Sequence, residues 1–185
     1  MKELSLNVLD IAENSVKAGA TLVTIHLIDD GEVLTMSIAD NGCGMKEEIL
    51  RSVIDPFYTT RTTRRVGLGI PLLKLAAEQT GGDVTITSRH ESEHPEAHGT
   101  EVVARFYTQH IDCTPMGDII STMTTLVQGH AEIDFEFLHR SSDFDVHLNT
   151  KEMREILGAE VPLNDPEILT WIAQYLKDQY EIKNQ

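Results

Sequence analysis

The stretch "DNGCGM", Asp40 to Met45, places an acid beside two glycines at the end of a run that alternates apolar and polar residues. Earlier in the chain, "NSVKAGA", Asn14 to Ala20, places an amide near the end of a helical pattern. Whether the protein is an enzyme depends on whether this amide and this acid serve the same site.

A helix is predicted over residues 3–18. Apolar and small residues recur there at helical spacing, among them Leu4, Val8 and Ile11, and Gly19 ends the pattern. Residues 21–40 then alternate apolar and polar side chains on both sides of the turn "DDGE", which predicts a β-hairpin.

The later chain continues to mix helices and strands. Short helical patterns are predicted at "KEEIL" and "GLGIPLLKLAAEQTGG", and strands at "DVTITS" and "GTEVVARFY". Beyond Tyr107 we expect a helix from Met116 to Val127, strands at "EIDFEFLH" and "FDVHLN", and helices at "KEMREILG" and after the N-cap Asp165. No long linker marks the boundary near residues 108–115, so the C-terminal part is expected to pack onto the first.

The composition excludes several classes of function. The 185-residue chain has a formal net charge of −15, so a nucleic acid would repel it. No apolar run approaches the roughly 20 residues of a membrane span, and acids interrupt the N-terminal stretch where a signal peptide would be apolar. We expect a cytoplasmic protein, with neither nucleic acid nor membrane as partner, in which Cys43 and Cys113 are reduced thiols.

One segment departs from the acidic background. "TTRTTRRVG", Thr59 to Gly67, contains three arginines and no acid, whereas residues 109–185 carry a net charge of −9 from 5 basic and 14 acidic residues. A cationic loop in an acidic chain predicts a local anionic ligand.

Asn7, Asp10 and Asn14 are spaced three and four residues apart, so the predicted helix displays them on one stripe. A stripe of this kind is often only a solvated surface. The order of the later motifs favours a site: "DNGCGM" at a strand end, the basic loop, "GLGI" opening a helix, and "HGT" opening a strand.

In this order the sequence resembles the GHKL ATPases, the superfamily of DNA gyrase, the large heat-shock chaperone, sensor histidine kinases and MutL proteins. The resemblance rests on five motifs, namely "ENSVKAGATLVTIHL" as the N box, "DNGCGM", "DPFYTTR" as the F box of histidine kinases, "GLGIPLLKLAAEQTGG" and "HGTEVVARF". It implies a Bergerat ATP-binding fold of the α/β class, a two-layer α+β sandwich whose mixed sheet has helices on one face. That domain is expected at residues 1–108, with an α/β extension of unknown role at residues 109–185.

The resemblance also implies a nucleotide site for ATP or ADP with Mg²⁺. Asn14 matches the amide that coordinates Mg²⁺, a cation that prefers oxygen ligands. Asp40 matches the carboxylate that accepts a hydrogen bond from the adenine amino group, and Thr100 matches a hydroxyl near it. Gly42 and Gly44 keep side chains away from the base.

A mobile lid over the phosphates is implied as well. Gly67 and Gly69, with Leu68 between them, match its hinge, where backbone N–H groups approach the phosphates. Thr60 belongs to the same nucleotide-binding set, and Arg61 is the expected phosphate contact.

The candidate catalytic residues are Asp10, Glu13 and Arg61. In gyrase and MutL relatives a glutamate four residues before the Mg²⁺ amide activates water, and this chain has the shorter Asp10 there. Glu13 points roughly 100° away from Asn14 around the helix. Histidine kinases do not depend on that glutamate, and the F box favours their branch.

We therefore expect phosphoryl transfer from Mg·ATP to a separate protein partner, or slow hydrolysis of ATP. The alternative is a nucleotide-dependent interaction module, similar to the anti-sigma kinases, with the acidic C-terminal part as its docking surface. Two other features have simpler interpretations: His90, His94 and His98 are expected in a solvent loop rather than at a metal, and Trp171 in the core.

Overall fold

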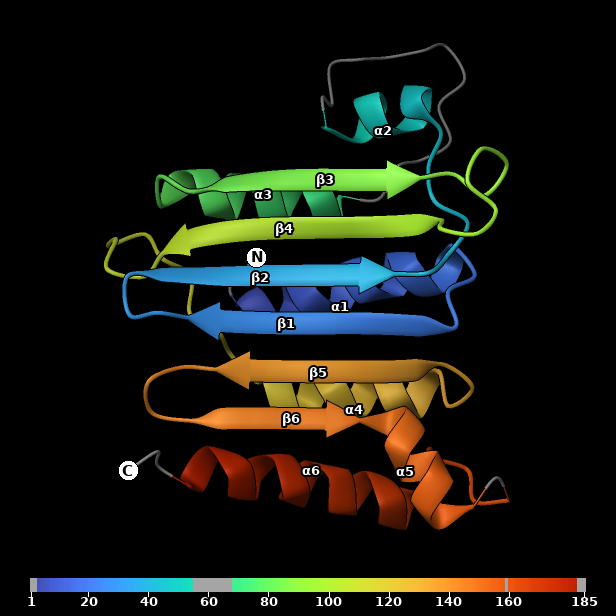
Figure 1. Ribbon diagram of the computed structural model, residues 1–185. Coiled ribbons are helices and arrows are strands. Elements are labelled where there is room, and N and C mark those ends of the chain that lie inside the picture. Colours follow the sequence, from blue (N-terminus) through green and yellow to red (C-terminus); the bar gives the residue numbers. More distant parts are fainter. Residues whose placement is uncertain (1–2, 55–67, 159, 183–185) are drawn as a thin grey trace.

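The computed structural model describes residues 3–54, 68–158 and 160–182. The elements, labelled in Figure 1, are α1 (Leu4–Lys17), β1 (Leu22–Asp29), β2 (Val33–Asp40), α2 (Glu47–Ile54), α3 (Gly69–Gln79), β3 (Asp83–Arg89), β4 (Gly99–Tyr107), α4 (Ile119–Gly129), β5 (Asp134–Arg140), β6 (Asp145–Asn149), α5 (Thr150–Leu157) and α6 (Pro166–Glu181). Every strand and helix predicted from the sequence is present, with small shifts at the ends.

The six strands form one mixed sheet in the order β3-β4-β2-β1-β5-β6. Neighbouring strands are antiparallel except β1 and β5, which run parallel and pair Val23 with Phe135. Strands from residues 1–108 and from residues 109–185 therefore share one sheet. The division into two units near residue 108 stays a prediction.

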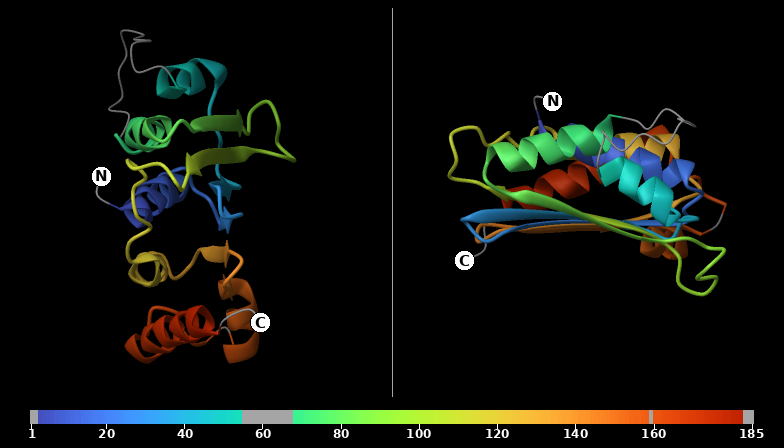
Figure 2. Two further views of the ribbon diagram at one scale, coloured as in Figure 1. Left: turned by 90° about the vertical axis from the view of Figure 1, so that its left-hand side faces the viewer. Right: turned by 90° about the horizontal axis from the view of Figure 1, so that it is seen from above.

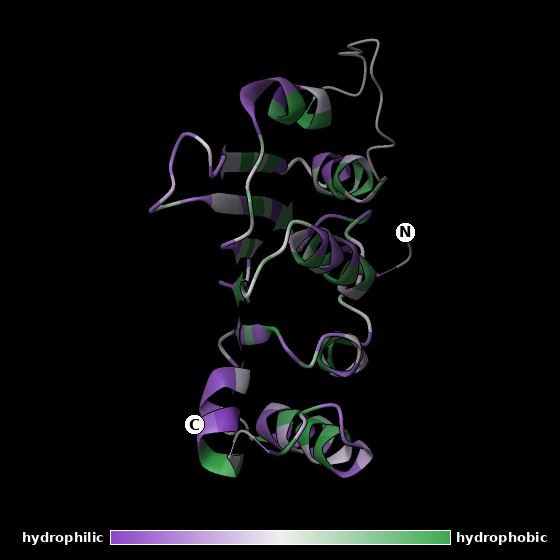
Figure 3. Cartoon of the chain, turned by 90° about the vertical axis from the view of Figure 1, so that its right-hand side faces the viewer, coloured by the Kyte–Doolittle hydropathy of each residue, from purple (hydrophilic) through white to green (hydrophobic). Residues whose placement is uncertain are grey.

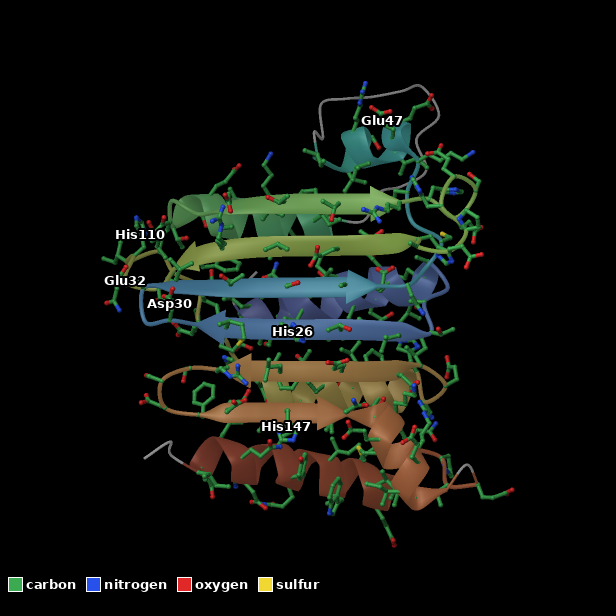
Figure 4. All side chains as sticks on the ribbon, viewed as in Figure 1. His26, Asp30, Glu32, Glu47, His110 and His147 are labelled. Atoms are coloured by element: carbon green, nitrogen blue, oxygen red, sulfur yellow. The ribbon has the colours of Figure 1, made fainter. Side chains whose placement is uncertain are left out.

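Helices α1, α3 and α4 lie on one face of the sheet, and α6 lies beside α4 next to β6 (Figure 2). Alternation along the strands creates this arrangement, since Val23, Ile25 and Leu27 of β1 are fully buried under the helices. His26 on β1 and His147 on β6 lie on the opposite face of the sheet (Figure 4). The predicted two-layer fold with helices on one face is confirmed.

The hydrophobic core is continuous from β3 to α6. Figure 3 shows the hydrophobic residues on the strands and on the helices that cover them. Phe106 on β4 and Phe135 on β5 are among the largest buried side chains, one from each side of the β1–β5 pairing. Within the described ranges no helix has both the length and the apolar character that crossing a bilayer requires.

Helix α4 begins three residues later than predicted. Gly117 has a φ of +76°, a left-handed conformation that interrupts a right-handed helix. Asp118 then serves as the N-cap, and its carboxylate accepts a hydrogen bond of 2.8 Å from the N–H of Ser121. The apolar spacing from Met116 onward indicated the helix, but the cap determines where it starts.

Strand β6 is at the edge of the sheet, and the C-terminal helix α6 covers the side of β6 that has no neighbouring strand. The side-chain amide of Gln179 accepts a hydrogen bond from the N–H of His147 and donates one to its carbonyl, each 3.0 Å long. These bonds satisfy backbone groups that a neighbouring strand would otherwise pair. Ile172 and Leu176 are buried, but Trp171 is 53% exposed and stacks on Tyr175, so the prediction that Trp171 lies in the core is wrong.

A buried histidine joins the same helix to the sheet. Nδ1 of His139 on β5 lies 2.7 Å from the hydroxyl of Tyr180 on α6, and the ring of Phe144 contacts His139 edge-on. Burial lowers the pKa of His139 to about 4, and the charge of Asp29 opposes this shift only in part. Burial also raises the pKa of Tyr180. The imidazole is therefore neutral at neutral pH.

This pKa predicts how stability depends on pH. Between about pH 6.5 and pH 4 the unfolded His139 binds a proton that the folded residue does not, so stability falls as the pH is lowered. The loss should approach about 3 kcal/mol near pH 4. Urea unfolding at pH 7, 5.5 and 4.5 should show a weaker pH dependence in His139→Phe than in the wild type.

Tyr180→Phe is the matched control, because it removes the hydrogen bond and keeps the titrating imidazole. It should lower stability at every pH while leaving the pH dependence between 6.5 and 4 in place. If stability depends on pH in His139→Phe as strongly as in the wild type, His139 is not the cause of the pH dependence.

Candidate functional site

A pocket of about 170 Å³ lies between the C-terminal half of α1, the end of β2 and the start of β4. It is lined by Ile11, Asn14, Ser15, Ala18, Ile38, Asp40, Gly44, Met45, Val53, Ile70, Thr100 and Val102. The wall is mainly apolar, with a small number of polar groups from three segments. A concave apolar site with a few polar groups is typical of small-molecule binding.

Asp40 is the centre of the polar groups. Its Oδ1 accepts hydrogen bonds from the N–H of Gly42 at 2.9 Å and of Thr100 at 3.2 Å. Its Oδ2 accepts one of 2.7 Å from the hydroxyl of Ser15 on α1. A carboxylate has about four acceptor positions, so one position on Oδ2 remains for a donor in the pocket.

The glycine loop, residues 41–45, requires glycine at two places. Gly44 has a φ of +68°, and a Cβ there would lie 1.9 Å from the carbonyl oxygen of Arg89. A Cβ on Gly42 would lie 2.9 Å from the Cβ of Ala18, at the pocket wall. These glycines let the loop pass close to β3 and α1, which supports the predicted roles of Gly42 and Gly44 without testing them.

Two side chains that come later in the sequence, Ser88 and His98, hold the backbone of the glycine loop in place. Nδ1 of His98 lies 2.6 Å from the carbonyl oxygen of Gly42, so Nδ1 carries the proton and donates. The hydroxyl of Ser88 accepts a bond of 2.7 Å from the N–H of Met45 and lies 2.8 Å from the hydroxyl of Thr100. His98 thus holds a backbone carbonyl, although the sequence placed it in a solvent loop.

The polar stripe of α1 divides into two parts. Asn7 is fully buried, and its amide has no hydrogen-bond partner among the residues that the structure describes. Asp10 and Asn14 are exposed, and Asn14 lines the pocket. The interpretation of this stripe as a solvated surface is wrong for Asn7.

Asp10 faces the first turn of α3. A Cβ on Gly69 would lie 3.2 Å from the Cβ of Asp10 and 3.7 Å from its Oδ2. The carboxylate therefore lies close to the positive end of the α3 dipole, where backbone N–H groups lack partners within the helix. Leu68, the residue before this helix, is 72% exposed.

Glu13 points away from the pocket. Its Oε1 lies 2.8 Å from Nε2 of His130, which caps the C-terminal end of α4. The pocket lining does not include it, so we leave Glu13 out of the catalytic set proposed below. Thr60, Arg61 and Gly67 lie outside the described residues, so their predicted roles stay predictions.

Sequence reasoning missed three positions that shape this site. Ser15 appeared as one more small residue on the buried face of α1, although a hydroxyl in an otherwise apolar stripe was a signal. Ser88 and His98 gave no local signal, because their partners are 43 and 56 residues away in the chain.

Two curated relatives are named as kinases. Sporulation kinase E of Bacillus subtilis is 34% identical over 89 residues, which are 48% of this chain and 12% of that protein. The signal transduction histidine-protein kinase AtoS of Escherichia coli is 30% identical over 89 residues, which are 48% of this chain and 14% of that protein. The chain thus spans a small part of the length of these relatives.

Two solved structures share the fold at low sequence identity. The N-terminal domain of a DNA repair protein has a TM-score of 0.55 at 16% identity, covering 80% of this chain and 52% of that one. The MutL ATPase domain of Aquifex aeolicus, complexed with ADP, has a TM-score of 0.54 at 15% identity, covering 85% and 69%. Residues 1–110 match the family described as histidine kinase-, DNA gyrase B-, and HSP90-like ATPase. This match covers more than half of the sequence, and the chain belongs to that ATPase family.

Proposed function

We propose that the pocket binds ATP with the adenine amino group donating to Asp40. The observation that carries this proposal is the hydrogen bonding of Asp40, which leaves an acceptor position on Oδ2 inside a largely apolar pocket. An acceptor at this place favours adenine over guanine, whose corresponding edge carries a carbonyl. The hydroxyl of Thr100, already oriented by Ser88, contributes a second polar group beside the base.

The phosphates would extend along the exposed side of α1 towards the first turn of α3. Lys17 lies one turn beyond Asn14 and is exposed, so it supplies a cation on that side. The N–H groups that open α3 at Gly69 supply further donors. We propose that Arg61, with Thr60, Gly67 and Leu68, completes this phosphate site from the lid.

Mg²⁺ fits the donors that the structure provides. The side chains of Asn14 and Asp10 are exposed and make no hydrogen bond to the rest of the described chain, so their oxygens are available. An amide oxygen, water molecules and phosphate oxygens form the kind of set that Mg²⁺ prefers, and we propose Asn14 as its protein ligand. When bound, Mg²⁺ would neutralise part of the phosphate charge.

Phosphoryl transfer to a separate protein partner, or slow hydrolysis, is the proposed reaction. In either case the bond between the γ-phosphorus and the ADP oxygen breaks as the nucleophile's oxygen or nitrogen bonds to phosphorus. The carboxylate of Asp10 lies beside the first turn of α3, and it would accept the proton if water attacks. Its short side chain makes that contact weak, which favours transfer to a partner over hydrolysis.

The second candidate is a nucleotide-dependent interaction module with little turnover. The exposed Trp171 on α6, which stacks on the partly buried Tyr175, favours it, because an exposed aromatic ring on an acidic segment suits a protein contact. Incubation with γ-labelled ATP and cell extract distinguishes the two. Acid-labile label on another protein supports transfer to a nitrogen, and capture of a partner without label supports the module.

Replacing Asp40 tests the adenine contact. Asp40→Asn removes an acceptor and presents an amide donor to the adenine amino group, which should cost about 1 to 3 kcal/mol of binding, or about 5- to 150-fold in affinity. Calorimetry with ATP and GTP measures this loss, and the wild type should prefer ATP.

The control for this variant is Asp83→Asn. Asp83 accepts two hydrogen bonds from Arg105 at the other end of the sheet, so its loss should leave ATP affinity unchanged. Equal ATP affinity in Asp40→Asn and the wild type would remove the adenine assignment.

A rate measurement tests the roles of Asp10 and Asn14. General-base activation of water contributes about 10²- to 10⁴-fold, and it needs the base within hydrogen-bond reach. Because Asp10 is short, hydrolysis should be slow and Asp10→Ala should change it little, whereas Asn14→Ala should abolish Mg²⁺-dependent ATP binding. Brisk hydrolysis that Asp10→Ala removes would instead make the protein an autonomous ATPase.

A further inference from the structure

The side-chain contact between Glu13 and His130 connects the ATPase-family segment to the rest of the chain. Oε1 and Nε2 are 2.8 Å apart, and the two side chains are 34% and 20% exposed. Glu13 lies on α1, within the residues 1–110 that match the family, and His130 lies beyond them at the end of α4. The contact therefore spans 117 residues of sequence.

Helix α1 is attached to the α4 segment at both of its ends. At its N-terminal end, the N–H groups of Leu4 and Ser5 donate to the carbonyls of Pro115 and Met116 at 2.9 and 2.8 Å. The carbonyl of Ser5 accepts a bond of 3.3 Å from the hydroxyl of Thr122 on α4.

The C-terminal half of α1 has a different attachment. In the described part of the chain, the Glu13–His130 pair is the polar contact that holds this half against α4.

This half of α1 is also a wall of the pocket. Ile11 and Ser15 line the pocket from the side of the helix opposite Glu13, and Asn14 lines it from roughly 100° away around the same turn. Ser15 holds Asp40 through a bond of 2.7 Å. A bond of that length weakens steeply when its donor moves, so a displacement of this turn would disturb Asp40 and the available oxygen of Asn14 together.

We propose that Glu13 and His130 form a positioning pair, which fixes the C-terminal half of α1 so that Ser15 and Asn14 meet the nucleotide correctly. This inference rests on the proposed function, since it names residues that regulate the geometry of the same site. Neither residue touches the nucleotide, and both act through α1. The C-terminal part of the chain then helps to position a wall of the nucleotide site without lining it.

The chain offers a matched control for a merely structural ion pair. Arg154 on α5 lies 2.9 Å from Asp134 at the start of β5, and both side chains are 28% exposed. The Arg154–Asp134 pair is similar to the Glu13–His130 pair in burial and in N···O distance, but neither Arg154 nor Asp134 lies on α1 or lines the pocket. Loss of this pair should affect stability alone.

The experiment compares ATP affinity with thermal stability in Glu13→Ala, His130→Ala, the double variant and Arg154→Ala. Each of the first two should weaken ATP binding by about three- to tenfold, and the double variant should be no weaker than the single ones, because the residues act as a pair. Arg154→Ala should lower the melting temperature and leave ATP affinity within about twofold of the wild type.

His130→Lys provides the rescue, because its ammonium can pair with Glu13. It should restore ATP affinity towards the wild-type value, and a variant that folds but does not restore it counts against the proposal. Unchanged affinity in Glu13→Ala and His130→Ala, or an equal loss in Arg154→Ala, would overturn the positioning role while the proposed function stands. A wild-type protein that binds no ATP would overturn the proposed function itself.

Discussion

The carboxylate of Asp40 joins the three segments that surround the pocket. Through Ser15 it holds α1, through Gly42 it holds the glycine loop, and through Thr100 it holds the start of β4. Hydrogen bonds to an ionised group are stronger than those between neutral groups, so one acid fixes the pocket's shape before any ligand arrives. The group that would recognise a base is thus also the group that assembles the walls around it.

Much of the fold could be predicted from the sequence, because its signals are local. The alternation of Val23, Ile25 and Leu27 with polar residues marked β1 and its buried face, and Asp165 with Pro166 marked the start of α6. The family resemblance supplied the positions of Asn14, Asp40, Gly44 and Thr100, which the structure brings together at one pocket.

The remaining features depend on contacts between distant residues, which no local pattern encodes. Trp171 is an exception, because its stacking partner Tyr175 lies on the same helix; it falls at the border of the apolar face, and its ring stays exposed. Glu13 could be assigned a direction around α1 but not a partner, because α4 had no predicted position relative to α1. Ser15 lies on the apolar stripe of α1, and nothing near it in the sequence indicates that its hydroxyl donates to Asp40.

The parallel pairing of β1 with β5 has a consequence for how the chain folds during synthesis. Strand β1 has β2 on one side, but its other neighbour begins only at Asp134. Until that strand has left the ribosome, the edge of β1 and the flank of α1 that α4 covers stay open to other chains. A fragment cut at the end of the family match would lack both β5 and α4, and would therefore leave this edge of β1 and this flank of α1 uncovered.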